Sequence, residues 1–430
     1  MLTIYTVLIY VLAPFALAVN AWRGRRDPAY RDRLGERWGY TRVQFDRAPL
    51  WVHAVSVGEV QACAALVRAL QRKYPHCKFL LTTGTPTGAQ RVRALFGDTV
   101  QHAYLPYDMP GAVKRFLKRV QPVAGIVMET EIWPNLFREC RRQSIPLVLA
   151  SARLSEKSVR RFCRFRPLVQ SALKCVAVAA QSGTDAERFR MIGADPAAVC
   201  VVGNIKFDIE IAPDLKSAGE SVRAAQFPNR QVWIAASTHE GEEELVLQAH
   251  GQVCEQVRNA LLLLVPRHPQ RFQGVRDMLV ARSVRFASRS RSELVQSDTR
   301  VLLVDTLGEL LMFYASADVA FVGGTLVPIG GHNLLEPAVL EKPIVFGPHN
   351  FNAPDIAQMF LAAGAACQVD SSESLAHHVV RLFGDDAARD RMGHHAAEIV
   401  SRNRGAIERL MVRIDSLVHP SEERVGVLHS

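Results

Sequence analysis

The stretch LWVHAVSVGEVQACAALVRALQRK (residues 50–73) decides the fold of the first half of the chain. Residues 50–55 are almost wholly apolar and rich in β-branched and aromatic side chains, which predicts a buried strand. Gly58 permits a turn, and residues 60–73 carry apolar side chains at helical spacing. A buried strand followed at once by a helix is the repeating unit of a parallel α/β sheet.

The same alternation extends along the chain. We expect further strands at 79–83, 125–128, 146–150, 176–179 and 199–202, and a second series at 232–236, 261–265, 284–287, 301–304, 319–322 and 344–346. The polar segment 209–230, with Pro213 and Pro228, is the expected linker, and residues 386–417 are expected to form a long helix. The sequence therefore predicts an α/β fold of two Rossmann-like, doubly wound domains, 23–208 and 209–430, the second ending in helices.

Composition excludes several classes of protein. Of the 430 residues, 48% are hydrophobic and 22% are charged, so the chain is not disordered or of low complexity. The eight Cys show no CxxC pair and no spacing typical of a metal site. This pattern indicates reduced thiols in the cytosol and neither a disulfide framework nor a zinc centre.

The N-terminus carries a separate signal. No charged side chain occurs from Met1 to Trp22, and residues 23–47 then hold eight Arg and four acids. The apolar run is just long enough to cross or anchor in a bilayer. Because the cations follow the run, the positive-inside rule keeps the rest of the chain in the cytoplasm. We expect a membrane anchor at residues 1–22; a cleavable signal peptide and a buried helix are the alternatives.

Charge is divided unevenly. Residues 1–208 hold 31 Lys and Arg against 15 Asp and Glu, whereas residues 209–430 hold 21 against 27. A basic first half indicates an anionic partner, which can be nucleic acid, an anionic membrane surface or a phosphorylated substrate.

Ligands of doubly wound sheets bind outside the carboxyl ends of the strands, so the residues there are the first candidates for function. Glu59 follows the first strand and is a candidate general base, with a helix-capping acid as the alternative. Glu129 and Glu131 follow the strand at 125–128. Strand-like alternation would aim one of them into the site and the other away, while an exposed loop is the alternative.

Basic residues follow in the same half. Lys206 comes after the strand at 199–202 and can neutralise a phosphate, or else pair with Asp208. Residues 151–166 carry six Lys or Arg with two interleaved Phe. Such a run is either a solvated helix face or a contact with a membrane surface or a phosphate.

The second half offers a different set of groups. Arg267 leaves a buried strand between Pro266 and Pro269, so its guanidinium is well placed to bind a phosphate. Asp305, Thr306 and Gly308 end another strand. Gly330 and Gly331 allow backbone to approach a ligand, Asn333 helps open a helix, and Glu336 lies within reach of ribose hydroxyls.

Several motifs are missing. The chain has no GxGxxG of the dinucleotide type, no GxxxxGK[ST], no HExxH and no Asp-x-Asp pair for a metal–diphosphate. NAD enzymes, P-loop NTPases and zincins are therefore disfavoured. We expect chemistry without a metal and without a cofactor.

Seven elements in this order make the chain similar to one known family. They are the apolar N-terminus, SVGE (56–59), METEIWPN (128–135), GNIKFD (203–208), PRHPQRF (266–272), DTLGEL (305–310) and GGHNLLEPA (330–338). Together they resemble the 3-deoxy-D-manno-octulosonic acid (Kdo) transferases of lipopolysaccharide synthesis. The resemblance covers essentially the whole chain.

The resemblance implies a GT-B fold and an inverting, metal-independent glycosyltransferase on the cytoplasmic face of an inner membrane. It implies CMP-Kdo as the donor, bound by residues 209–430, and a phosphorylated lipid A precursor as the acceptor, bound by residues 23–208. By the same resemblance Glu59 is the base, and Glu129 and Lys206 stabilise the transition state. CMP contacts fall on Pro266, Arg267, Leu307, Gly308, Glu309, Asn333, Leu334, Leu335 and Glu336. One departure is Leu307, where the family pattern favours Met, which affects only a side-chain role.

Two alternatives stay open. The first is another nucleotide-sugar enzyme of the same fold, a glycosyltransferase or an epimerase, because fold alone does not choose a donor. The second is a non-catalytic protein that binds anionic lipid or nucleic acid through its basic half. No recognisable RNA- or DNA-binding motif occurs, so we expect no nucleic-acid partner.

Overall fold

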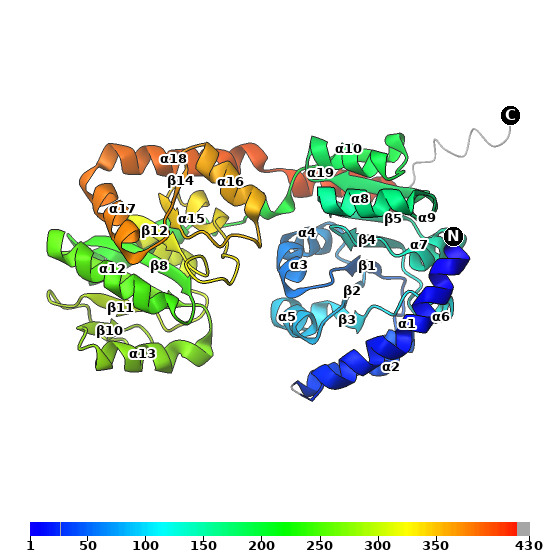
Figure 1. Ribbon diagram of the computed structural model, residues 1–430, viewed down its shortest axis with the longest axis horizontal. Coiled ribbons are helices and arrows are strands. Elements are labelled where there is room, and N and C mark those ends of the chain that lie inside the picture. The colour runs from blue at the N-terminus through cyan, green and yellow to red at the C-terminus, as the bar shows by residue number, and fades with distance from the viewer. Residues whose placement is uncertain (26, 419–430) are drawn as a thin grey trace. The chain divides into compact units, whose positions relative to one another are not determined.

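Two α/β units are formed by the alternating strands and helices of the computed structural model, which describes residues 1–25 and 27–418 (Figure 1). Unit 1 consists of Met1–Asp208 together with the C-terminal segment from Asn403. Unit 2 is the continuous stretch Ile209–Arg402. The chain therefore leaves unit 1 after Asp208, where the sequence predicts a boundary, but returns to it at the end.

The sheet of unit 1 has seven parallel strands among the described residues, in the order β3-β2-β1-β4-β5-β6-β7. Its strands are β1 (Leu50–His53), β2 (Phe79–Thr83), β3 (Gln101–Tyr104), β4 (Ala124–Met128), β5 (Leu147–Ala152), β6 (Val176–Ala180) and β7 (Val199–Val201). Leu50 pairs with Phe79 on one side and with Ala124 on the other. The strand order thus reverses between β1 and β4, and such a switch point is where doubly wound folds bind ligands.

Helices cover both faces of this sheet, which is why its central strands are buried throughout and mostly apolar. They are α2 (Leu34–Arg37), α3 (Val57–Ala62), α4 (Ala64–Lys73), α5 (Pro86–Phe96), α6 (Pro110–Val120), α7 (Pro134–Arg142), α8 (Glu156–Arg164), α9 (Arg166–Leu173) and α10 (Gly183–Met191), with 3-10 turns η1 (Pro28–Tyr30), η2 (Gly97–Thr99), η3 (Pro196–Ala198) and η4 (Ile205–Phe207).

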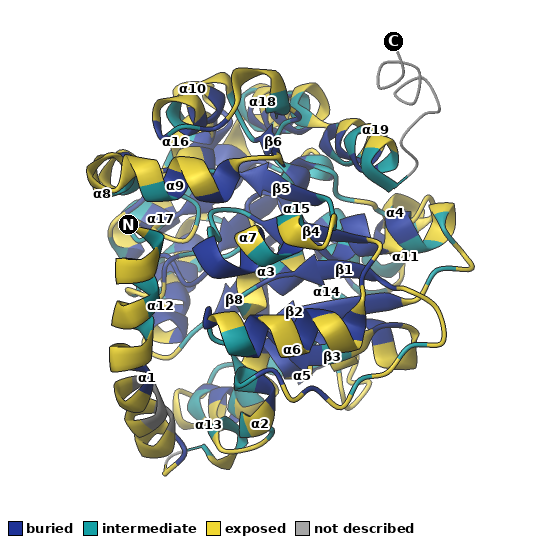
Figure 2. Ribbon diagram, turned by 90° about the vertical axis from the view of Figure 1, so that its right-hand side faces the viewer, coloured by how far each residue is buried: buried dark blue, intermediate teal, exposed yellow. Residues whose placement is uncertain are grey.

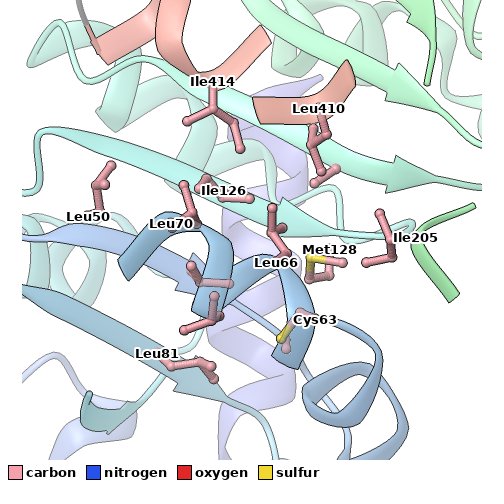
Figure 3. Packing of buried hydrophobic residues seen from close by; sticks show 14 of the residues in the cluster. Leu50, Cys63, Leu66, Leu70, Leu81, Ile126, Met128, Ile205, Leu410 and Ile414 are labelled. Atoms are coloured by element: carbon pink, nitrogen blue, oxygen red, sulfur yellow. The ribbon is translucent and has the colours of Figure 1, made fainter. Parts of the chain in front are cut away.

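The last helix, α19 (Ala406–Val418), completes the core of unit 1. Leu410 and Ile414 belong to the same buried cluster as Leu66 and Ile126 (Figure 3). This differs from the expected assignment of residues 209–430 to one domain. The expected single helix at 386–417 is also interrupted, because Gly405 adopts a left-handed backbone (φ 85°) between α18 (Asp386–Asn403) and α19.

Unit 2 repeats the plan of unit 1. Its seven parallel strands, counted within the described residues, run in the order β10-β11-β9-β8-β12-β13-β14. They are β8 (Gln231–Thr238), β9 (Ala260–Pro266), β10 (Phe286–Ser288), β11 (Val301–Leu303), β12 (Val319–Val322), β13 (Ile344–Phe346) and β14 (Ala366–Gln368). Here the order reverses between β8 and β12, which places the expected ligand site of unit 2 at their carboxyl ends.

The helices of unit 2 begin inside the expected linker. They are α11 (Leu215–Gln226), α12 (Glu242–Gln256), α13 (Phe272–Ala281), α14 (Leu310–Ser316), α15 (Leu335–Val339), α16 (Pro354–Ala362), α17 (Ser372–Gly384) and α18, with the 3-10 turn η5 (Pro269–Arg271). Residues 209–230 are thus partly an ordered helix, which packs on α14 through the close approach of Gly219 to Ala315.

The apolar N-terminus forms helix α1 (Leu2–Arg23). Its inner side contacts unit 1, where the Tyr5 hydroxyl donates to Asp108 Oδ2 (2.9 Å) and the Thr6 hydroxyl donates to Asn135 Oδ1 (3.1 Å). Its outer side is exposed (Figure 2), with large apolar side chains at Ile4, Val7, Leu8, Val11, Leu12 and Phe15. None of the helices within residues 1–25 and 27–418 combines the length and the apolar character that crossing a membrane requires.

Candidate functional site

Glu59 lies in the first turn of α3, directly after β1 at the switch point of unit 1. The Ser56 hydroxyl caps this helix by accepting from the Glu59 N–H (3.3 Å). The Glu59 carboxylate in turn accepts from the Val55 N–H (2.9 Å) and from the Ser56 hydroxyl (3.2 Å). These hydrogen bonds hold the carboxylate in place, so its capping role and a chemical role are compatible.

Burial raises the pKa of Glu59 to about 7. The negative charges of Glu129 and Glu131 contribute to this increase, while the hydrogen bonds from Val55 and Ser56 oppose it. A carboxylate with a pKa close to neutral is a much better proton acceptor than an exposed glutamate. The geometry and the pKa both suit a general base.

Glu129 follows β4, the neighbour of β1 across the switch point. It has a left-handed backbone (φ 54°), an uncommon conformation for a residue with a side chain. Its N–H donates to the Ala150 carbonyl (3.0 Å), which fixes the turn on the next strand. The carboxylate lies 3.9 Å from Lys206 Nζ, so the two predicted residues meet.

Lys206 lies in η4, after β7. The Asn204 side chain caps this turn by accepting from the Lys206 N–H (3.0 Å). The alternative partner, Asp208, is engaged elsewhere, since its carboxylate accepts from the N–H groups of Gly405 and Ile407 (2.6 and 2.5 Å). The start of α19 thereby holds the segment that carries Lys206.

Glu131 lies two residues after Glu129. The expectation that one of them points into the site and the other away was wrong in its premise, because residues two apart in a strand share a face. In addition, β4 ends at Met128 and the next residues form a turn. Burial raises the pKa of Glu131, and the charge of Glu129 raises it further. Since both carboxylates act on Glu59, three acids and one lysine gather at the switch point of unit 1.

Unit 2 contains a pocket of about 710 Å³ at the carboxyl ends of its strands. Two predicted CMP contacts, Leu307 and Glu309, line it, and Leu307 is 71% exposed. Glu309 forms a two-point ion pair with Arg289 (2.7 and 3.1 Å). The other lining residues are Pro269, Phe272, Ser290, Ser292, Asp305 and Thr306.

A buried polar network supports the wall of this pocket. Asp305 accepts from Arg276 Nη2 (2.5 Å), from the Ser288 hydroxyl (2.9 Å) and from the Ser290 N–H (2.8 Å). Burial acts to raise the pKa of Asp305, but the hydrogen bonds of Ser290 and Ser288 outweigh it, and the pKa is lowered. Sequence reasoning missed Arg276, which lies in α13, and also Arg289 and the two serines, which lie in or just beyond the short edge strand β10.

The remaining predicted donor contacts lie at the ends of β9 and β12. Arg267 is exposed after β9, and its charge lowers the pKa of Glu336, which burial raises. Asn333 accepts from the Leu335 N–H (3.1 Å) and donates to Glu336 (3.3 Å). The side chains of Pro266, Leu334 and Leu335 are buried. Gly308 has φ 86° and opens the turn beside Glu309.

No group of three or more His, Cys, Asp or Glu in the described chain is arranged to hold a metal ion. The roles of the site residues remain predictions. In unit 1 the structure brings Glu59, Glu129 and Lys206 close together. In unit 2, Leu307 and Glu309 line the pocket, while Arg267 lies within electrostatic range of Glu336.

Two parallel α/β units of this kind place the chain in the class of GT-B-like folds. A solved UDP-GlcNAc 2-epimerase from Neisseria meningitidis has this fold, with a TM-score of 0.54 at 14% identity, over 85% of this chain and 100% of that one. Within the class, residues 32–209 match the family model described as 3-deoxy-D-manno-octulosonic-acid transferase (kdotransferase). The chain is also 40% identical to the 3-deoxy-D-manno-octulosonic acid transferase of Haemophilus influenzae over 98% of both chains.

The chain therefore belongs to the 3-deoxy-D-manno-octulosonic acid transferase family, and the resemblance inferred from its motifs is confirmed. The C-terminal CMP-Kdo binding domain of WaaA from Acinetobacter baumannii also matches, at 31% identity and a TM-score of 0.43, over 44% of this chain and 100% of that one.

Proposed function

We propose that this protein transfers Kdo from CMP-Kdo to a phosphorylated lipid A precursor, with inversion at the anomeric carbon and Glu59 as the general base. Family membership supports Kdo as the transferred group, because the relative at 40% identity is a Kdo transferase. The observation that carries the mechanism is the switch point of unit 1, where Glu59, with a pKa of about 7, lies within the electrostatic reach of Glu129.

The reaction is a direct displacement. Glu59 takes the proton of an acceptor hydroxyl, and the hydroxyl oxygen forms a bond to the anomeric carbon of Kdo. The bond from that carbon to the CMP phosphate oxygen breaks, and its electron pair leaves with CMP. Charge therefore moves from the base to the departing phosphate, which is where preorganised cations lower the barrier.

Two cations suit this demand. Lys206 is held by η4 and by the carboxylate of Glu129, so it enters the reaction without a large change of position. Arg267 stands after β9 in unit 2 with its backbone fixed by a hydrogen bond from its N–H to the Thr238 carbonyl (3.0 Å). A guanidinium on a fixed backbone is a good ligand for a phosphate.

The acceptor and the membrane belong to the same proposal. The exposed apolar side of α1 and the excess of Lys and Arg in residues 1–208 support attachment to an anionic inner membrane on its cytoplasmic side. A lipid that carries phosphates is presented at such a surface. We expect α1 to be the segment that anchors the protein there.

The experiment is to incubate the purified full chain with CMP-Kdo and lipid A precursor, and to measure CMP release and the mass of the lipid product. Addition of one or more Kdo units supports the proposal, and absence of CMP release contradicts it. Glu59→Gln should lower kcat by about 10²–10⁴-fold, the usual contribution of a general base. The matched control is Glu187→Gln, an exposed acid on α10 that should leave kcat unchanged.

A further inference from the structure

Two histidines of unit 2 form a pair that the proposed mechanism does not use. His239 follows β8 and His332 lies in the loop after β12, so they come from the two strands of the switch point. Their ring planes are only 4° from parallel, with centroids 5.0 Å apart. The two Nε2 atoms lie 2.8 Å apart, which is a direct hydrogen bond between imidazoles.

This hydrogen bond fixes how the protons are placed. One ring must carry its proton on Nε2 to donate, and the other must keep Nε2 bare to accept. The accepting ring then carries its proton on Nδ1. Within the described contacts neither Nδ1 has a hydrogen-bond partner, so the pair offers one free N–H and gains a second when it takes up a proton.

A buried carboxylate and a glycine beside the rings hold the pair in place. The buried carboxylate of Glu242 accepts from the N–H groups of His239 (3.2 Å) and Gly324 (2.7 Å), which fixes both sides of the pair. A Cβ at Gly324 would lie 3.0 Å from Cδ2 of His332, and φ there is 68°. A glycine at this position therefore makes room for the ring.

Positive charge surrounds the pair. The pKa of His239 is lowered to about 4, mainly by burial, and the charges of His268, Arg267 and Arg271 contribute to the decrease. Arg271 is itself paired with Glu243 (3.0 Å) and Glu240 (3.4 Å). The cationic side chains near the pair therefore favour the binding of an anion.

We propose that the His239–His332 pair binds the carboxylate that Kdo carries on its anomeric carbon, and thereby selects an acidic sugar donor. This inference rests on the proposed function. The anomeric carbon of a CMP-ulosonic acid bears two anions, the phosphate and the carboxylate. Arg267 suits the phosphate, because a guanidinium matches its oxygens in a two-point contact. The imidazole pair, with one free N–H and room for one proton, suits a single carboxylate beside it.

The test compares the donor with its leaving group in the full-length enzyme. His332→Phe removes both nitrogens and keeps a ring beside Gly324. It should raise KM for CMP-Kdo about 10- to 100-fold, the worth of a hydrogen bond to a charged group, while the inhibition constant of free CMP stays within about twofold. His332→Asn, which restores an amide near Nδ1, should recover part of the loss. Arg267→Ala should weaken CMP-Kdo and CMP together.

Controls separate the possible failures. His394→Gln, an exposed histidine on α18, should change neither constant, and thermal melting checks that each variant is folded. If His332→Phe weakens CMP as much as CMP-Kdo, the pair binds the phosphate and the proposal is wrong. If neither constant changes, the pair does not contact the donor. If the wild-type protein releases no CMP from CMP-Kdo, the proposed function itself fails.

Discussion

Lys206 Nζ lies 3.9 Å from Glu129 Oε1, although 76 residues separate them along the chain. Glu129 follows β4, and Lys206 follows β7 at the edge of the same sheet. The pair is about one quarter to one third exposed, so its contribution to stability is small. We propose that it serves the reaction, because the charge of Glu129 acts on Glu59.

The first prediction concerns this pair. Glu129→Gln and Lys206→Gln should each lower kcat by about 10²-fold, as expected for loss of a preorganised charge. Because each residue orients the other, the double variant should lose much less than the product of the single effects. Steady-state kinetics of the three variants measure this, and melting temperatures close to wild type show that the loss is not one of folding. Strictly multiplicative losses would mean that the residues act independently.

The second prediction is a pH profile. The pKa of Glu59 is raised from 4.5 to about 7, so its carboxyl is protonated, and unable to accept a proton, below that pH. Hence kcat/KM should rise with pH through about 7. Burial is the main cause of the raised pKa and Glu129 adds to it, so Glu129→Gln should move this limb to lower pH, by up to about one unit.

Glu187→Gln is the control for the profile, since its exposed carboxylate lies on α10. The acceptor phosphates titrate equally in the reactions of both variants, so their effect on the pH profile cancels when the profiles are compared. A limb that stays in place in Glu129→Gln would show that another group sets it.

The third prediction tests the attachment of α19. The carboxylate of Asp208 accepts from two N–H groups at the start of this helix, those of Gly405 and Ile407. Asp208→Ala should lower the free energy of unfolding of unit 1 by about 1–2 kcal/mol, the typical worth of such a cap. Denaturant unfolding of the full chain measures it. Asp214→Ala is the matched control, because Asp214 precedes α11 without a side-chain capping bond.

The fourth prediction concerns the wall of the unit 2 pocket. Asp305 and Arg276 form a buried ion pair at 2.5 Å with side chains 3% and 10% exposed. Asp305→Asn leaves the guanidinium without its charge partner, which should cost about 3–5 kcal/mol. Asp298→Asn breaks an exposed pair with Arg285 in the same unit and should cost less than about 1 kcal/mol. Equal losses in the two variants would contradict the role given to burial.

Much of the fold follows from strand periodicity. The strands at 79–83, 319–322 and 344–346 match their predicted bounds, because each is a buried and mostly apolar run. The prediction missed β3 and β14. Both lie at or next to a sheet edge, and they contain residues such as Gln101 and Gln368, so no continuous apolar run marks them.

The site was predictable where a residue directly follows a strand. Glu59, Glu129 and Lys206 became candidates in this way, and the sheet order brings two of those strand ends together. The position of Glu131 was not, because residues two apart in a strand share a face, and the left-handed backbone at Glu129 ends the strand geometry before Glu131. Arg289 and Arg276 pair with acids distant in sequence, and such pairing depends on tertiary packing that local patterns do not encode.

The discontinuity of unit 1 bears on how the protein is made. A ribosome must synthesise all of Ile209–Arg402 before α19 emerges. Until then, the apolar surface of unit 1 around Leu66 and Ile126 stays uncovered. Unit 2, by contrast, is continuous and can close its core while translation proceeds. Expression of the first 208 residues alone should therefore give an aggregation-prone fragment, and supplying the C-terminal helix as a separate peptide should rescue it.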